Sequence, residues 1–260
     1  MAQPTPTPAF PLSGKAVRPQ SDSDIRRCLL CERRAGSVCA GMDEASLAVL
    51  ARSSRKIQLP PGTTIVEEGD HAGAFFNITA GTVKLFKSLP DGRRQITGFA
   101  DAGQFLGLGN TDVYPFGAET VNAVQLCRFQ RQQLEALLID LPRFERNLLA
   151  SVTERLTEAQ EQMLLLGRKT AREKVASFLL GRLAIGCQAD LSALPEAEPL
   201  ASVPMTRVDI ADYLGLTIET VSRTISALRR EKIIASTESH SIRILAPATL
   251  RHIATGQPQA

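Results

Sequence analysis

Glycines punctuate residues 57–131, and short runs rich in β-branched and aromatic side chains lie between them. Three such runs occupy 63–66, 75–78 and 81–86, and Asp91-Gly92 stands between two runs of this kind, which is a strong hairpin signal. Many short strands at about ten-residue spacing favour an antiparallel barrel or jelly roll over a parallel α/β sheet. The pattern predicts an antiparallel β domain.

The length of 260 residues suits one large or two ordinary domains, and a hydrophobic fraction of 43% excludes a chain that is disordered throughout. No apolar run approaches the roughly 20 residues that span a bilayer. The first residues carry no apolar segment typical of a secretory signal, so we expect a cytoplasmic protein. Residues 1–23 hold five of the fifteen prolines, and we expect a disordered leader there.

Apolar residues at alternating steps of three and four follow the β region. Asp140 and Pro142 mark the start of the predicted helix and Gly167 its end. The residues at this spacing are Leu149, Val152, Leu156, Ala159, Met163 and Leu166. The spacing is that of a heptad seam, and it predicts a dimerisation helix over 140–167. An amphipathic helix packed on its own domain would show the same pattern, but the length of this helix favours the dimer.

Residues 168–255 are predicted to form a second domain, followed by a short tail over 256–260. A new amphipathic helix opens at about residue 169, and the stretch 188–204, with three prolines and few large apolar residues, predicts a loop. Thr206-x-x-Asp209 then begins one short helix, Gly215 supplies a sharp turn, and Thr217 caps a second helix. Two short strands over 233–236 and 241–245 complete a winged helix-turn-helix.

The second of these helices carries a polar stripe opposite its buried residues. Glu219, Ser222 and Arg223 lie in its first turns, where a recognition helix reaches base edges. Arginine can donate two hydrogen bonds to guanine, and glutamate can accept one from cytosine. Further along, Arg229, Arg230 and Lys232 suit phosphate contact. The alternative is an ordinary surface ion pair between Glu219 and Arg223; the turn and the wing favour DNA binding, which a net charge of +3 permits.

Three cysteines lie close together near the N-terminus, in the pattern Cys28-x2-Cys31-x7-Cys39. A closed tetrathiolate site needs a fourth thiol, for which Cys127 and Cys187 are the candidates. Structural zinc sites usually show two close pairs, so the spacing favours an iron–sulphur cluster over zinc. Uncoordinated or redox-paired thiols are the remaining alternative.

Three further segments carry a family resemblance: Gln95-Ile96-Thr97-Gly98-Phe99, Asp212-Tyr213-Leu214-Gly215-Leu216-Thr217 and Glu219-Thr220-Val221-Ser222-Arg223. With the cysteine-rich segment, the β region and the seam helix, they resemble the Crp/Fnr family of bacterial transcription regulators over roughly residues 25–255. The cysteines resemble those of its oxygen-sensing Fnr branch.

The resemblance implies an α+β fold: an N-terminal antiparallel β-roll (jelly-roll) sensor domain over 43–139, a coiled-coil dimerisation helix and a C-terminal winged helix-turn-helix domain. It implies a [4Fe-4S] cluster on Cys28, Cys31, Cys39 and Cys127, with 24–42 as the cluster-binding segment and Cys187 left unligated. It also implies a homodimer on palindromic double-stranded DNA with TTGAT half-sites, and RNA polymerase as a partner.

Some positions depart from the family pattern. Residues 105–122 lack the Glu and Arg-Ser combination with which relatives hold a cyclic phosphate, so we expect no cyclic nucleotide. The loop 90–94 is basic where relatives can carry an acidic polymerase-contacting residue. Ala159 replaces an acidic residue that is common in the Fnr branch, and a carboxylate there would repel its mate across a two-fold axis.

Two other readings remain open from the sequence. A regulator of the same family could use zinc or a thiol–disulfide switch in place of the cluster. An iron–sulphur enzyme is disfavoured, because the histidines at 71, 240 and 252 lie far from the cysteines in the sequence. We therefore expect a regulator and not an enzyme.

Overall fold

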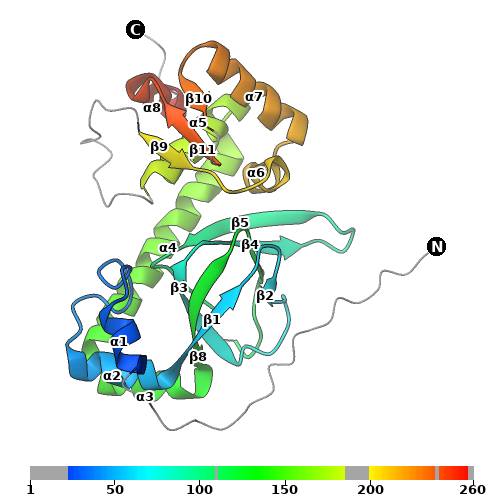
Figure 1. The fold of residues 1–260 in the computed structure, drawn as a ribbon. Coiled ribbons are helices and arrows are strands. Elements are labelled where there is room, and N and C mark those ends of the chain that lie inside the picture. Colours follow the sequence, from blue (N-terminus) through cyan, green and yellow to red (C-terminus); the bar gives the residue numbers. More distant parts are fainter. Residues whose placement is uncertain (1–22, 109–110, 185–198, 238–239, 257–260) are drawn as a thin grey trace.

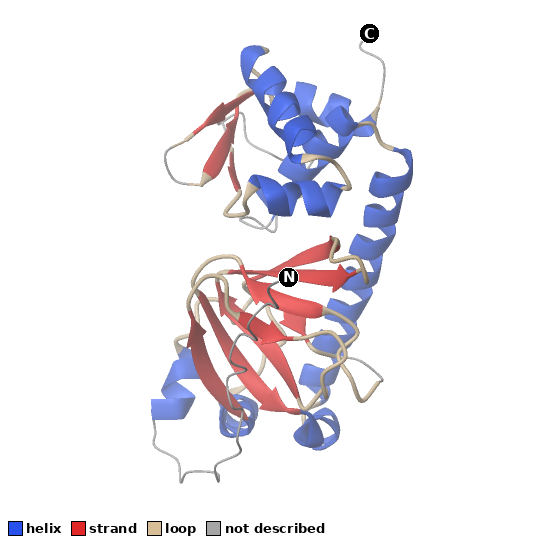
Figure 2. Cartoon of the chain, turned by 90° about the vertical axis from the view of Figure 1, so that its right-hand side faces the viewer, coloured by secondary structure: helices blue, strands red, loops and turns tan. Residues whose placement is uncertain are grey.

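The computed structural model describes residues 23–108, 111–184, 199–237 and 240–256. A β domain and a helical domain lie at the two ends of the long helix α4 (Pro142–Arg168), as Figure 1 shows. Figure 2, turned by 90°, shows that α4 runs along one side of both domains. None of the helices in the described ranges has the length and apolar character needed to cross a membrane.

The β domain is built of two four-stranded antiparallel sheets, which confirms the predicted β-roll. One sheet has the strand order β1-β8-β3-β6 and the other β2-β7-β4-β5. The strands of the first sheet are β1 (Ser54–Leu59), β8 (Val124–Gln130), β3 (Ala74–Ala80) and β6 (Phe105–Leu106). Those of the second are β2 (Thr64–Val66), β7 (Gly117–Thr120), β4 (Thr82–Ser88) and β5 (Arg94–Asp101). Their facing side chains, among them Ile78, Val83 and Leu126, are almost fully buried.

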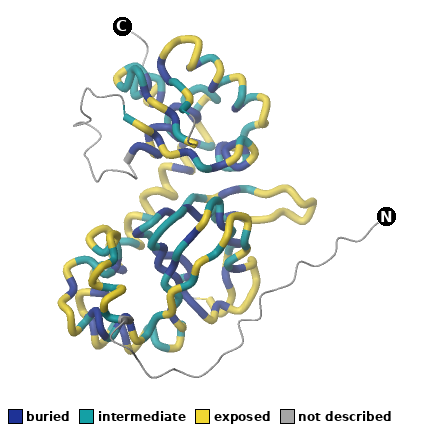
Figure 3. Tube along the Cα trace, viewed as in Figure 1, coloured by how far each residue is buried: buried dark blue, intermediate teal, exposed yellow. Residues whose placement is uncertain are grey.

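The hairpin predicted at Asp91-Gly92 joins β4 to β5. Its turn is closed by backbone hydrogen bonds from Leu89 to Arg93 (2.8 Å) and from Gly92 to Leu89 (2.9 Å). Gly92 has a φ of +85°, which explains why glycine stands there. The exposed tip projects from the body of the molecule (Figure 3).

The outer face of the first sheet is covered by short helices from both ends of the β region: α1 (Ser23–Leu29), α2 (Glu44–Ser53) and α3 (Leu134–Asp140). Phe75 and Phe129 stack on this face with their ring centroids 4.9 Å apart, and Phe105 lies 4.9 Å from Phe75. The first turn of α4 adds the fully buried Phe144 to the same cluster. The N-terminal segment is thereby packed against the sheet and against α4.

Asp140 does not begin the long helix. It is the last residue of α3, a helix that the sequence analysis missed, and Leu141 separates α3 from α4. Pro142 does occupy the first turn of α4, where its missing N–H costs nothing. The leader predicted over 1–23 lies outside the described residues except for Ser23, which starts α1.

The C-terminal domain is the expected winged helix-turn-helix. Its helices are α5 (Ala171–Ala184), α6 (Arg207–Leu214), α7 (Ile218–Arg230) and α8 (Pro247–Thr255). Its wing is a three-stranded sheet in the order β10-β11-β9, made of β10 (Ile234–Ser236), β11 (Ser241–Ile244) and β9 (Leu200–Ser202). The loop predicted over 188–204 is therefore wrong at Leu200–Ser202, because these residues pair with β11 and bury Ala201 completely. Residues 185–198 lie outside the described ranges.

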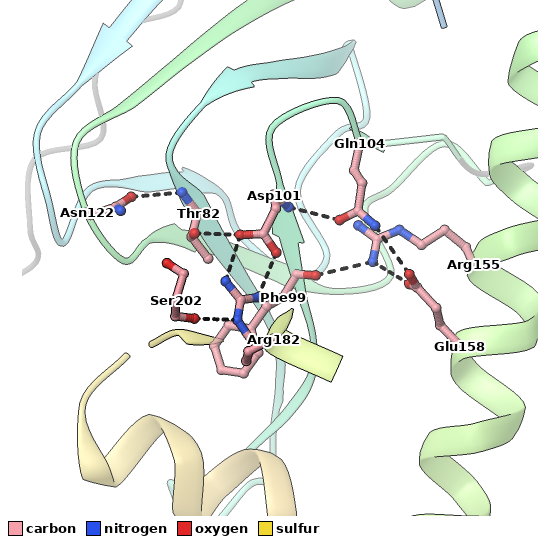
Figure 4. A network of polar contacts seen from close by, with 9 residues as sticks. All are labelled: Thr82, Phe99, Asp101, Gln104, Asn122, Arg155, Glu158, Arg182 and Ser202. Carbon is pink, nitrogen blue, oxygen red and sulfur yellow. Dashed lines mark hydrogen bonds and ion pairs between the residues drawn. The ribbon is translucent and has the colours of Figure 1, made fainter. Parts of the chain in front are cut away.

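A buried ion pair joins the two domains. Arg182 of α5 donates to both carboxylate oxygens of Asp101 at the end of β5, at 2.7 and 3.1 Å, and both side chains are less than a tenth exposed. The hydroxyl of Thr82 also donates to Asp101 (2.6 Å), and the guanidinium of Arg182 reaches the carbonyl of Ser202 (2.8 Å). Figure 4 shows that the charges lie at the centre of a polar network that connects β5, α5 and the wing.

The same network reaches α4. The backbone N–H of Asp101 donates to Gln104 (2.9 Å), and the amide of Gln104 donates to Glu158 on α4 (3.2 Å). Arg155, one turn earlier, binds Glu158 (3.1 Å) and the carbonyl of Phe99 (3.4 Å), as Figure 4 shows. A second ion pair between the domains joins Lys84 of β4 to Asp209 of α6 (2.9 Å).

We predict that Arg182→Met strongly destabilises the protein, because it leaves Asp101 charged and buried without its partner. Loss of one member of a buried ion pair costs about 3–5 kcal/mol. The measurement is the melting temperature of the purified protein by calorimetry. Adding Asp101→Leu to Arg182→Met should recover much of the loss, since no charge is then left buried.

Glu68→Gln is the matched control, because it removes an ion pair (Lys87–Glu68, 2.8 Å) that is exposed to solvent. Exposed pairs contribute little, so its melting temperature should stay close to that of the wild type. Equal effects of Arg182→Met and Glu68→Gln would contradict the prediction.

Candidate DNA-binding surface and cysteine centre

The helix-turn-helix forms from local signals in the sequence. Thr206 caps α6 by accepting from the backbone N–H of Asp209 (3.1 Å), and the Asp209 carboxylate accepts from the backbone of Thr206 (3.0 Å). Gly215 ends α6 with a φ of +60°, a conformation that other residues rarely adopt. Thr217 then caps α7 by accepting from the N–H of Thr220 (3.2 Å). The predicted caps and turn are confirmed.

The helix α7 buries one face and exposes the other. Val221, Ile225 and Leu228 lie in the domain core, as expected. On the opposite side Glu219 and Arg223 are exposed, and Ser222 is half-buried. Within the described part of the chain no ion pair joins Glu219 to Arg223, but Arg223 lies near enough for its charge to act on Glu219. Hydrogen bonds from its own backbone N–H and from Thr217 hold the pKa of Glu219 below its usual range, which keeps it an anionic acceptor.

The positively charged residues at the end of α7 extend this surface. Arg229 and Arg230 are exposed in its last turn. Burial lowers the pKa of Arg207 at the start of α6, and the nearby charge of Arg229 lowers it further. The sequence analysis missed Arg207, because its neighbour lies 22 positions away in the chain. Together these residues form a basic rim beside the exposed face of α7.

The predicted seam residues lie on the free side of α4. Leu149, Val152, Leu156 and Met163 are 66%, 49%, 59% and 66% exposed, and Ala159 is also exposed. Figure 3 shows this middle part of α4 uncovered between the two domains. Leu166 differs from the others, because it is half-buried against the core of the C-terminal domain. The exposed apolar stripe of this chain therefore runs from Leu149 to Met163.

Four cysteines from three separate segments converge beside the first sheet. Cys28 lies on α1, Cys31 follows that helix, Cys39 lies in the loop before α2, and Cys127 lies on β8. All four are partly buried and unbridged. The charges of the other three thiols each act on Cys39, and those of Cys28 and Cys31 act on Cys127. The structure thus brings Cys127 to the N-terminal cysteines, while Cys187 lies outside the described residues.

Burial is the main influence on two of these thiols. It raises the pKa of Cys39 to about 12, with a smaller contribution from the neighbouring cysteines and a small opposing one from the Ser37 hydroxyl. It raises the pKa of Cys127 to about 11, against which the charges of Lys56 and Arg27 act weakly. Both thiols of the apoprotein are therefore protonated at neutral pH.

The spacing of the thiols bears on what they could bind. Among the described residues, no three His, Cys, Asp or Glu side chains stand as close together as ligands of a single metal ion do. The loop that carries Cys39 is tied to α4, since the amide of Asn147 donates to the carbonyls of Val38 and Ala40, both at 2.9 Å. These contacts hold the Cys39 loop against the first turns of α4.

A buried amide beside the cysteines was not anticipated. Asn77 on β3 is 3% exposed and pairs directly with Cys127 across the sheet. Its side-chain oxygen has no hydrogen-bond partner. No local pattern marks this residue, because its neighbour lies 50 positions along the chain and their pairing depends on strand register.

The segment that binds a cyclic phosphate in relatives is occupied by other contacts here. Glu119 on β7 binds Lys84 (2.8 Å) and lies 3.6 Å from Arg94. The ring of Phe86 lies directly over Gly117, where an added Cβ would come within 2.5 Å of it. The expectation that this chain binds no cyclic nucleotide stays a prediction.

A β-roll joined through a long helix to a winged helix-turn-helix defines a class of protein, the two-domain DNA-binding regulators. Residues 173–253 match the family model of the Crp-like helix-turn-helix domain, and residues 56–140 match that of the cyclic nucleotide-binding domain. The chain belongs to the Crp/Fnr family of transcriptional regulators, and it is not an enzyme.

Relatives of known sequence and structure agree with this assignment. The nitrogen fixation regulation protein FixK of Bradyrhizobium diazoefficiens is 39% identical over 227 residues, which cover 87% of this chain and 93% of FixK. The transcriptional activator protein FnrL of Cereibacter sphaeroides is 35% identical over 212 residues, covering 81% and 85%. The structure of FixK2 from Bradyrhizobium japonicum superposes with a TM-score of 0.68 at 32% identity, covering 80% of this chain and 99% of FixK2.

We predict that Cys39 and Cys127 of the folded apoprotein react slowly with iodoacetamide at pH 8. Only the thiolate reacts, and burial holds both pKa values well above that of an exposed cysteine, so fewer thiolates are present. Alkylation should be on the order of 100-fold slower for Cys127 and on the order of 1,000-fold slower for Cys39 than in the guanidinium-unfolded chain, and it should accelerate as pH rises towards 11. Peptide mass spectrometry after timed quenching measures this, and equal rates in the folded and unfolded chains would contradict it.

Proposed function

We propose that this chain is an oxygen-responsive transcriptional activator whose DNA binding depends on a [4Fe-4S] cluster held by Cys28, Cys31, Cys39 and Cys127. The observation that carries the proposal is the convergence of four unbridged thiols from three segments of the chain. It fits the sequence pattern of three clustered thiols and one remote thiol, which is typical of iron–sulphur sites.

The donor set fits such a cluster better than a single zinc ion. In a cluster each thiolate binds a different iron atom, so the sulphurs stand further apart than around one zinc ion. Structural zinc sites usually show two close pairs of cysteines, a spacing that this sequence lacks. The positive charges of Lys56 and Arg27 act on Cys127 and would favour its thiolate form. When bound, the cluster supplies iron chemistry that dioxygen disrupts.

The residues around Cys39 offer a route from this centre to the dimer helix. Asn147 holds the carbonyls on either side of Cys39, and it lies on α4 two residues before the exposed Leu149. Cys39 fixed as a ligand would therefore hold its loop, and through Asn147 the first turns of α4, in one position. Cys39 released from the site would leave this loop held by Asn147 and packing alone.

The exposed stripe of α4 would then pair with its copy in a second chain. Leu149, Val152, Leu156 and Met163 have the heptad spacing of a parallel two-helix seam, and Ala159 places no charge on the two-fold axis. A homodimer places two α7 helices in successive major grooves about 34 Å apart. The palindrome TTGAT-N4-ATCAA is the expected kind of site, with RNA polymerase as the further partner.

The names of the relatives support the biological role. FixK is a nitrogen fixation regulation protein and FnrL a transcriptional activator protein, and both match over most of their length. We infer that this chain activates genes for low-oxygen metabolism. A zinc-dependent or thiol-redox switch at the same cysteines is the alternative hypothesis. The iron, sulphide and zinc contents of the purified protein distinguish the two.

We predict that anaerobically purified protein contains iron and acid-labile sulphide in equal amounts, about four of each per chain. Cys39→Ser or Cys127→Ser should remove both, together with anaerobic DNA binding, because each removes one ligand. Elemental analysis, the visible absorbance spectrum and a DNA-binding titration under argon measure these changes.

Cys187→Ser is the matched control and should leave iron, sulphide and DNA binding unchanged. A colourless wild-type protein would overturn the cluster. Stoichiometric zinc would then support the zinc-dependent switch, and a disulfide without metal would support the thiol-redox switch.

We predict that Arg223→Ala weakens DNA binding by roughly 1–3 kcal/mol and relaxes specificity at one base pair of each half-site. Arg229→Ala should instead weaken binding about equally on all sequences and lower the salt dependence, because phosphate contacts carry no sequence information. Anisotropy titrations against every single-base variant of the half-site, at several salt concentrations, distinguish the two. Uniform weakening by Arg223→Ala would assign that residue to phosphate.

A further inference from the structure

Asn77 occupies a position where packing alone calls for an apolar residue. It lies on the face of β3 that also carries Phe75, next to Phe105 on the neighbouring strand. It is 3% exposed, and its side-chain oxygen has no hydrogen-bond partner. A buried polar group without a partner destabilises a protein, so its presence here calls for a ligand or a partner.

The strand register fixes what Asn77 faces. In the antiparallel pair of β3 and β8, Asn77 stands directly opposite Cys127. Side chains of directly opposite residues lie on the same face with Cβ atoms about 4.5–5.5 Å apart. On the other side of β8, Lys56 of β1 stands opposite Cys127 in the same way, but Lys56 is exposed to solvent. The buried neighbour of the Cys127 sulphur is therefore the amide of Asn77.

An amide at this position can form a hydrogen bond with the Cys127 sulphur whether that sulphur is a thiol or a thiolate. The carbonyl oxygen and the NH₂ group of Asn occupy equivalent places after a 180° rotation of the amide. The oxygen can accept from a thiol, and the NH₂ group can donate to a thiolate. An apolar residue could do neither, and a carboxylate would add negative charge beside a thiolate.

We propose that Asn77 is a positioning residue of the cysteine centre, whose NH₂ group donates a hydrogen bond to the Cys127 sulphur when that sulphur is a cluster ligand. The proposal rests on the proposed function above, since it concerns the ligated form of Cys127. Partners of metal ligands orient them and strengthen their binding. In the loaded protein a 180° rotation of the amide would bring its NH₂ group to the place of the oxygen that has no partner here, and the NH₂ group would donate to the Cys127 sulphur.

This role predicts opposite effects of one substitution on the two forms of the protein. Asn77→Leu keeps the branching and the number of heavy atoms of the side chain and removes both polar atoms. In the apoprotein it removes an unsatisfied buried group, so the melting temperature should rise by roughly 2–4 °C. In the loaded protein it removes a donor to Cys127, so iron should pass to an excess of a ferrous chelator under argon on the order of 10-fold faster than in the wild type.

Two further variants sharpen the test. Asn77→Asp keeps the shape but replaces the donor with a carboxylate, so it should lose iron faster than Asn77→Leu. Thr79→Val is the matched control, because its hydroxyl on the same strand is also buried and unpartnered but does not face a cysteine in the register. It should leave the rate of iron release unchanged.

The outcomes separate this inference from the proposed function. Iron and sulphide absent from the wild type would remove the proposed function and this inference with it. If the wild type binds the cluster but Asn77→Leu and Asn77→Asp both release iron at the wild-type rate, this inference is overturned and the proposed function stands. A lower melting temperature of the Asn77→Leu apoprotein would also overturn it, since Asn77 would then serve the packing of the sheet.

Discussion

The buried ion pair of Asp101 and Arg182 determines how the two domains of this chain sit on one another. Charges that are removed from water and matched by two hydrogen bonds tolerate little displacement, because any separation leaves each of them unsatisfied. Asp101 ends a strand of the β-roll, and Arg182 lies near the end of the first helix of the DNA-binding domain. Through Gln104 and Glu158 the same contacts extend to α4, so three parts of the molecule share one polar network.

Two of the three segments that resemble the family, 95–99 and 212–217, contact each other. The amide of Gln95 donates to the carbonyl of Asp212 (2.6 Å), at the end of the first helix of the helix-turn-helix. The ring of Phe99 lies 5.2 Å from that of Tyr213, centroid to centroid. Residues 95–99 thus form the β-roll side of the contact between the domains, and residues 212–217 form its helix-turn-helix side. This contact gives both motifs a structural role in addition to any contact with DNA.

The parts that could be predicted from the sequence depend on near neighbours in the chain. The caps at Thr206 and Thr217, the turn at Gly215 and the hairpin at Gly92 each follow from a few adjacent residues, and the structure agrees with them. Strand β9 and the contacts of Asn77 and Arg182 could not be predicted, because each depends on partners 20 or more positions away. Asp101 and Arg182 are 81 positions apart, and no local pattern tells a buried arginine from an exposed one. The small number of cysteines made Cys127 and Cys187 the candidates for a fourth ligand, and the family resemblance selected Cys127.

The helix α4 is held by amide side chains near both ends and by Arg155 and Glu158 on the side that faces the β domain, and its opposite side is exposed. Near its start the amide of Asn147 donates to the carbonyls on either side of Cys39. Near its end the amide of Gln162 donates to the carbonyl of Tyr213 (2.7 Å), beside the turn of the helix-turn-helix. A helix of this length moves as a rigid element, so a shift of its first turns also moves its last turns. The exposed apolar stripe occupies that middle part. Pairing of two chains along it would therefore fix the direction of both helices, and with it the separation of the two recognition helices.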